Sequence, residues 1–135
     1  MNKSIQTLLD SGNDIQAHRL NSEQIDENFC DLHAPLSSVE ASIEADRCYF
    51  CYDAPCSIAC PTDIDIPGFI YKIRSGNRLG SAQTILSENI MGAMCARVCP
   101  TEILCEEACV RNTQDNKPVE IGSLQRFATD PVLQD

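Results

Sequence analysis

The stretch that decides the fold is Arg47-Cys48-Tyr49-Phe50-Cys51-Tyr52-Asp53-Ala54-Pro55-Cys56-Ser57-Ile58-Ala59-Cys60-Pro61. Its four cysteines follow the spacing Cys-x2-Cys-x4-Cys-x3-Cys, and a proline comes directly after the last one. A second run follows as Cys95-x3-Cys99-Pro100-x4-Cys105-x3-Cys109. Two compact runs of thiols, each with a Cys-Pro step, are typical of ligands for two iron–sulfur clusters.

The composition favours a small domain that depends on metal. The chain has 135 residues and nine cysteines, with 5% aromatic residues and no tryptophan. A small domain with few aromatic residues and many cysteines usually needs disulfides or metal. Disulfides require an oxidising compartment, but residues 1–10 show no apolar signal-peptide core. The odd number of cysteines would also leave one thiol unpaired. We therefore expect metal ligands in a cytoplasmic protein.

Charge excludes some partners and suggests others. The net charge is −10, which argues against binding to nucleic-acid phosphates. No stretch approaches the length of a membrane-spanning helix. Residues 1–46 hold nine acidic and two basic side chains, whereas residues 47–126 hold nine and eight. A cluster held by thiolates is anionic, so Arg47, Arg97 and Arg111 are candidates to offset its charge. The alternative is that they are ordinary surface residues.

The expected fold is all-α, with short helices around the clusters, because no segment shows the alternation of a strand. Ser37 and Glu40 form a capping box that opens a helix with Val39 and Ile43 on one face. Asp65 caps a helix that has Pro67 in its first turn. The apolar stripe of that helix is Ile66, Phe69, Ile70 and Ile73, and Gly76-Asn77 ends it.

The remaining helical signals surround the second cysteine run. A stripe of Leu79, Ala82, Ile85 and Leu86 ends near Asn89. Cys95 and Cys99 lie one turn apart, and Pro100 ends their helix. Thr101 is expected to cap a further helix on which Cys105 and Cys109 share a face. Residues 112–118 read as a polar loop, and a last helix turns Ile121, Leu124 and Ala128 inward.

We divide the chain into an acidic arm or extension (residues 1–37), a two-cluster domain (38–130) and a short tail (131–135). Cys30 and His33 lie in the arm. A Cys-x-x-His pair could bind metal, but nothing nearby completes a four-ligand set, so Cys30 is interpreted as a bystander.

The spacing implies that the two runs share their ligands. In ferredoxin-type runs, the cysteine before the proline binds the other cluster. This rule separates Cys60 from Cys48, Cys51 and Cys56. A zinc-stabilised interaction module is the non-redox alternative, but zinc modules usually have paired Cys-x2-Cys knuckles or histidine. The chain has one Cys-x2-Cys and no histidine within residues 47–126.

Gln125 lies at the edge of the apolar stripe of the last helix. A partly buried amide needs a hydrogen-bond partner, which could be backbone or water. The sharper alternative is that its oxygen binds iron.

These motifs resemble a known family. The residues that carry the resemblance are Arg47 to Cys56, Cys60-Pro61-Thr62, Cys95 to Thr101, Leu104-Cys105, and Ile121 to Thr129. They are similar to the N-terminal iron–sulfur domain of dihydropyrimidine dehydrogenases, which the glutamate synthase small subunit and related flavin-linked subunits share. The resemblance covers about residues 38–130. It implies an α-helical ferredoxin with two [4Fe–4S] clusters and no catalytic residues of its own.

The resemblance also implies ligands, position by position. One cluster would take Cys48, Cys51, Cys56 and Cys109. The other would take Cys60, Cys99, Cys105 and the side chain of Gln125. The glutamine follows the dihydropyrimidine dehydrogenase pattern, whereas the glutamate synthase branch tends to carry an acidic residue there. Cys95 matches a family cysteine that is not a ligand, although spacing alone favours it, and it stays the alternative to Gln125.

In the resembling family this domain precedes a part that binds FAD and NAD(P)H. Electrons pass from the nicotinamide to FAD, through the clusters, to a second redox site that reduces a pyrimidine or makes glutamate. The chain has no Gly-x-Gly-x-x-Gly motif. We therefore expect FAD and NAD(P)H in a partner or in a missing C-terminal region. A terminal reductase, such as an FMN-containing pyrimidine-reducing subunit, is the other expected partner.

Overall fold

The computed structural model describes residues 20–133. The chain divides into two units, Met1–His33 and Ala34–Asp135. In the first unit, α2 (Ser22–Asn28) begins at a capping box between Asn21 and Gln24, and none of its residues is buried. Cys30 and His33 follow it and are exposed. The domain boundaries expected from the sequence stay a prediction.

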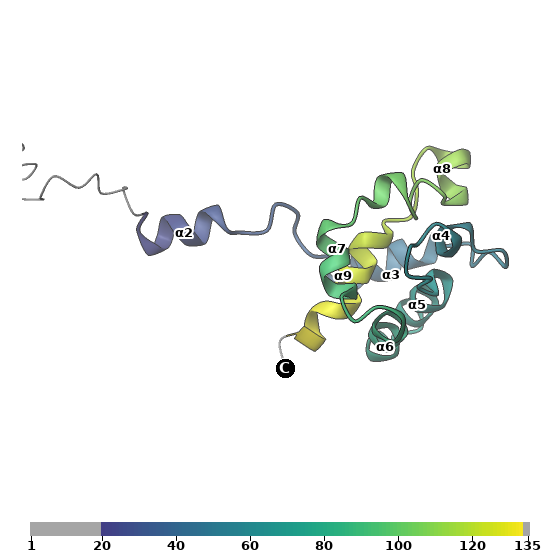
Figure 1. Ribbon diagram of the computed structural model, residues 1–135, viewed down its shortest axis with the longest axis horizontal. Helices are drawn as coiled ribbons and strands as arrows, with labels where there is room; N and C mark the ends of the chain where they lie inside the picture. Colours follow the sequence, from purple (N-terminus) through teal and green to yellow (C-terminus); the bar gives the residue numbers. More distant parts are fainter. Residues whose placement is uncertain (1–19, 134–135) are drawn as a thin grey trace, which may run out of the picture. The chain divides into compact units, whose positions relative to one another are not determined.

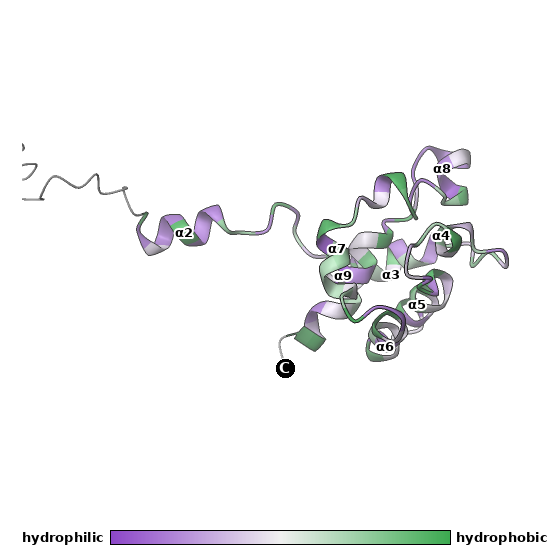
Figure 2. Cartoon of the chain, in the orientation of Figure 1, coloured by the Kyte–Doolittle hydropathy of each residue, from purple (hydrophilic) through white to green (hydrophobic). Residues whose placement is uncertain are grey.

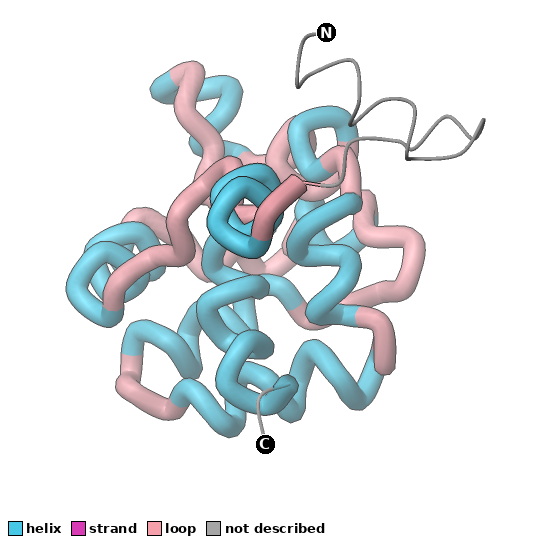
Figure 3. The backbone as a smooth tube through the Cα atoms, turned by 90° about the vertical axis from the view of Figure 1, so that its left-hand side faces the viewer, coloured by secondary structure: helices cyan, strands magenta, loops and turns pink. Residues whose placement is uncertain are grey.

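The second unit consists of short helices joined by loops (Figure 1). In chain order they are α3 (Ser38–Asp46), α4 (Pro55–Ile58), α5 (Ile66–Arg74), α6 (Arg78–Glu88), α7 (Gly92–Val98), the 3₁₀ turn η1 (Thr101–Ile103), α8 (Val110–Asp115) and α9 (Ile121–Leu133). Residues 20–133 contain no strand (Figure 3), which confirms the all-α prediction. Within the same range no helix is long and apolar enough to cross a membrane.

α9 is the central helix of this unit. It packs against α3, α5, α6 and α7, and α5 packs in turn against α3, α4 and α6. Hydrophobic and hydrophilic residues are mixed along these helices (Figure 2), and α5 and α9 each bury an apolar face. The stripes predicted for α5 and α9 are confirmed, since both helices bury them. The largest fully buried side chains include Phe69, Ile66, Ile70, Ile85 and Leu124.

The predicted capping signals are also confirmed. The Ser37 hydroxyl accepts a hydrogen bond from the Glu40 amide, and the Glu40 carboxylate accepts one from the Ser37 amide. The hydrogen bonds from Ser37 lower the pKa of Glu40. Asp65 caps α5 by accepting from the Gly68 amide. Gly76 follows α5 with a φ of 77°, the left-handed conformation that suits glycine after a helix end.

Three exposed residues differ from the predicted apolar stripes. Val39 and Ile43 share one face of α3, but they are 68% and 61% exposed. The small residues Ala41 and Ala45, both fully buried, make the inner face instead. On α6 the core takes Ala82 and Ile85, whereas Leu79 is 64% exposed. Small side chains let these short helices approach α5 closely.

The predictions for residues 101–118 are wrong in part. Thr101 makes no side-chain cap, and η1 ends after one turn at Ile103. The chain then runs through turns, so Cys105 and Cys109 do not share a helix. Part of the predicted polar loop is helical, because α8 covers Val110–Asp115 and ends at Asn116 in a left-handed conformation.

Candidate metal centres

The first cysteine run is built from tight turns. Cys48 follows the end of α3, and Cys56 lies in the single turn of α4. Phe50, Ala54 and Asp63 have φ angles of 51°, 38° and 53°. Residues other than glycine pay a conformational cost in this left-handed region, and such strain tends to gather at functional sites. The turns direct several cysteine side chains toward one place, which a regular helix could not do.

Four cysteines from the two runs line one pocket, which we call the first site. They are Cys48, Cys51, Cys56 and Cys109. The pocket is partly open to solvent. Its other walls are Pro55, Pro67, Val110 and Val119, together with Tyr49 and Arg111. Mostly apolar walls limit water, as iron–sulfur sites require to tune their potentials.

Burial makes bare thiolates unfavourable in the first site. It raises the pKa of Cys56 to about 11, and the negative charge of Cys48 adds to the effect. The pKa of Cys48 is also raised, first by burial and then by the charges of Cys109 and Cys51. Cations among these sulfurs would remove both penalties. The donor set and its surroundings therefore fit a thiolate-bound cluster.

The sulfurs are not arranged around a single ion. Among the described residues, no three His, Cys, Asp or Glu side chains are close enough together to hold one metal ion. A zinc ion holds all its ligands at about 2.0–2.3 Å, whereas each cysteine of a [4Fe–4S] cluster binds a different iron.

Cys60, Cys99 and Cys105 form a second group. We call these three thiols, with the predicted ligand Gln125, the second site. Burial raises the pKa of Cys105 to about 12, followed by the charges of Glu106, Cys99 and Cys60. The pKa of Cys99 is raised by burial and then by the charges of Cys95 and Cys60. The three thiols thus share one electrostatic environment.

Gln125 is 7% exposed and lies on α9. Its Nε2 donates a hydrogen bond of 2.6 Å to the carbonyl oxygen of Gly92, the first residue of α7. This bond ties Gln125 to the helix that leads into Cys99. A glutamine can bind iron only through Oε1, and the hydrogen bond to Gly92 uses the amide nitrogen instead.

Cys95 belongs to a chain of polar contacts beside the second site. Its Sγ accepts a hydrogen bond of 3.2 Å from Nδ2 of Asn89, which also lies 3.4 Å from Oγ1 of Thr62. That hydroxyl lies 3.5 Å from the Sγ of Cys60. The sequence analysis missed Thr62 and Asn89. The only signal for them in the sequence is that each polar residue lies near a cysteine, Thr62 after Cys60 and Asn89 before Cys95.

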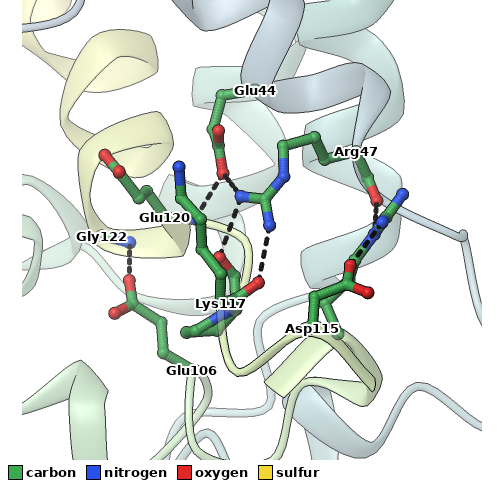
Figure 4. A network of polar contacts seen from close by, with 9 residues as sticks. Glu44, Arg47, Glu106, Asp115, Lys117, Glu120 and Gly122 are labelled. Carbon is green, nitrogen blue, oxygen red and sulfur yellow. Dashed lines mark hydrogen bonds and ion pairs between the residues drawn. The ribbon is translucent and has the colours of Figure 1, made fainter. Parts of the chain in front are cut away.

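The three arginines have different partners. Arg47 binds Glu44 and the carbonyl oxygens of Lys117 and Pro118, and Glu44 also accepts from the Glu120 amide (Figure 4). Arg97 pairs with Asp130 at 2.8 Å. Only Arg111 lines the first site. Arg47 therefore fastens α3 to the segment before α9, and the sequence could not separate these roles.

Comparison with known proteins identifies a family that matches most of the chain. The protein family described as dihydropyrimidine dehydrogenase domain II, 4Fe-4S cluster, matches residues 25–135. The chain belongs to this family. The predicted fold class and the prediction of [4Fe–4S] cofactors are thereby confirmed. The ligand set of each cluster stays a prediction.

Individual relatives agree with the family. The NAD-dependent dihydropyrimidine dehydrogenase subunit PreT of Escherichia coli K12 is 50% identical over 105 residues, which are 77% of this chain and 25% of PreT. The PreT homolog of Salmonella typhi is 49% identical over the same shares. UacF of E. coli K12 is 30% identical over 118 residues, 87% of this chain and 18% of UacF. The chain thus spans about a quarter or less of the length of these relatives.

Proposed function

We propose that the chain carries electrons through two [4Fe–4S] clusters, between a flavin and NAD(P)H site and a second redox site of an oxidoreductase such as dihydropyrimidine dehydrogenase. The family match and the name of the PreT relatives support this class of function. The flavoprotein part and a terminal reductase, such as an FMN-containing subunit that reduces a pyrimidine, are the proposed partners. A reducing cytoplasm would suit thiol ligands.

The observation that carries the proposal is the composition of the first site. Cys109 belongs to the second run by sequence, yet it lines the pocket with three cysteines of the first run. We propose that Cys48, Cys51, Cys56 and Cys109 hold one cluster there. Cys60, Cys99, Cys105 and Gln125 hold the other. Each bound cluster would accept and release single electrons.

The chain's own residues position the sulfurs and limit water. Pro55, Pro67 and Val119 wall the first site, and burial of Cys105 to 7% exposure shields the second. The proposed role is transfer of electrons, with no bond chemistry performed by the chain.

The test is anaerobic purification followed by iron and sulfide analysis. We expect about eight iron and eight acid-labile sulfide per chain, the content of two [4Fe–4S] clusters. Reduction by dithionite should give two electron paramagnetic resonance (EPR) signals. A preparation that contains zinc without sulfide or visible absorption would refute the proposal.

Cys95 remains the alternative fourth ligand of the second site, because its charge acts on Cys99. Gln125→Ala should change one EPR signal and spare the other, whereas Cys95→Ala should leave both signals intact. The reverse result would assign the iron to Cys95.

A further inference from the structure

Arg111 is held firmly beside the first site. Its Nε donates a hydrogen bond of 2.7 Å to the carbonyl oxygen of Arg47, and its NH1 pairs with Asp115 at 2.7 Å. Its guanidinium lies 4.2 Å from the centre of the Tyr49 ring. Arg47, in turn, is fixed by the network that joins α3 to residues 117–120 (Figure 4). A charge anchored on three sides keeps one position.

Arg111 is the cation of this wall. Of the described residues that line the first site, Arg111 is the only one with a charged side chain apart from the cysteines. Its field reaches the sulfurs, since it acts on both Cys48 and Cys109. The remaining walls are apolar or aromatic, so little polar material screens the charge on that side.

A fixed cation has a definite effect on a cluster. Reduction adds one negative charge to a group that is already anionic. A nearby positive charge stabilises the reduced form more than the oxidised form, so it raises the reduction potential. Asp115, paired with Arg111 and further out on α8, opposes this effect.

We propose that the fixed positive charge of Arg111 raises the reduction potential of the cluster in the first site, and that the negative charge of Asp115 moderates this effect. This inference rests on the proposed function, because it requires a cluster held by Cys48, Cys51, Cys56 and Cys109. It distinguishes Arg111 from Arg47, which does not line the first site and whose guanidinium binds Glu44 and two backbone carbonyls.

The experiment is a redox titration of the anaerobically purified chain, followed by EPR. Arg111→Gln should move one of the two midpoint potentials to a more negative value and leave the other in place. Arg111→Lys keeps the charge, so its midpoint potential should lie close to the wild-type value. Asp115→Asn should move the same midpoint in the positive direction. Higher salt should shrink both shifts, because the side chains of Arg111 and Asp115 are 22% and 44% exposed.

Arg78 offers a matched control. It donates from Nε to the carbonyl oxygen of Phe127 and lies 4.0 Å from the centre of that ring, but it does not line the pocket. Arg78→Gln removes the same kind of stacked, backbone-anchored cation and should leave the midpoint of the first site unchanged.

The outcomes separate this inference from the proposed function. Unchanged midpoints in a cluster-loaded Arg111→Gln chain, or a negative shift in Asp115→Asn, would overturn the role of Arg111 and leave the clusters in place. If Arg111→Gln fails to hold iron, the proposal still requires two results. The midpoint potential of the first site must shift in the positive direction in Asp115→Asn, and it must stay close to the wild-type value in Arg111→Lys. A wild-type chain without iron and sulfide removes the proposed function and this inference together.

Discussion

The first and second sites solve the same electrostatic problem differently. The first site brings four thiols into a pocket with mostly apolar walls and places one cation, Arg111, beside them. The second site brings three thiols together with the Thr62 hydroxyl beside Cys60, and the charge that acts most strongly on Cys105 is the negative one of Glu106. On the proposed ligand sets, the first site offsets negative charge from outside the ligands. The second site reduces that charge by replacing one thiolate with an amide.

The largest effect should come from removing iron from both sites. The helices between the ligands are short and the chain has few aromatic residues, so we expect metal binding and folding to be coupled. We expect chelated protein to lose much of its helix between residues 47 and 126, measured by far-UV circular dichroism. Helix content equal to that of the loaded protein would contradict this. Hydrogen exchange should show α5 and α9 as the last to open, because they share an apolar core.

A matched pair of substitutions should separate the two sites. Cys109→Ser should abolish the cluster of the first site, and Cys105→Ser that of the second, because serine is a poor substitute for a soft thiolate. Each variant should retain about half the iron of the two-cluster protein and one EPR signal, and the two remaining signals should differ. Loss of the same signal in both variants would mean that these cysteines serve one cluster.

Gly92 should matter to the second site alone. An alanine Cβ there would lie 2.4 Å from Cγ2 of the buried Ile85, so α7 must shift and carry the Gly92 carbonyl away from Gln125. Gly92→Ala should lower the free energy of unfolding by about 1–3 kcal/mol, measured by denaturant titration. It should also alter the signal of the second site.

Gly80→Ala provides the control for Gly92. An added Cβ at Gly80, in the first turn of α6, meets only the side chain of Asn77. That variant should weaken the helix cap and gain helix propensity by similar amounts of about 1 kcal/mol, so its free energy of unfolding should change little and both EPR signals should stay unchanged. Altered cluster signals in Gly80→Ala would remove the special role of Gly92.

The smallest effect concerns the strained turns of the first site. Ala54 has a φ of 38°, which glycine adopts without a steric cost. Ala54→Gly should raise the free energy of unfolding of the loaded protein by about 0.5–1 kcal/mol. Ala96→Gly, inside α7, should lower it by about 1 kcal/mol. Equal signs for both substitutions would show that the conformation of Ala54 carries no strain.

Much of the fold could be predicted from local signals. Ser37 and Asp65 cap their helices through contacts with residues three positions away. The helical period of the apolar residues in α5 and α9 predicts the face that each helix buries. The pattern failed for Val39 and Leu79, because alanines take the inner positions of tightly packed short helices. Nothing in a single helix's sequence says which of two faces its neighbours will cover.

The helix predicted to carry both Cys105 and Cys109 is wrong because the two cysteines lie in different sites. Cys105 and Cys109 are four residues apart, so a regular helix would direct both to one side. Cys109 lines the first site, whereas Cys105 lies with Cys99 and Cys60. The chain must therefore leave the helical path between them. The ligand division implied by the family resemblance contained this information, but the helical pattern did not.

The position of Cys109 in the pocket also bears on how the protein is made. On the proposed ligand sets, the first site is incomplete until Cys109 has been synthesised, and the second until Gln125 has been. A ribosome that has produced only the first cysteine run has not yet produced a complete set for either cluster. Cofactor insertion would then follow translation of α9, and a truncated nascent chain would expose thiols that a completed chain protects.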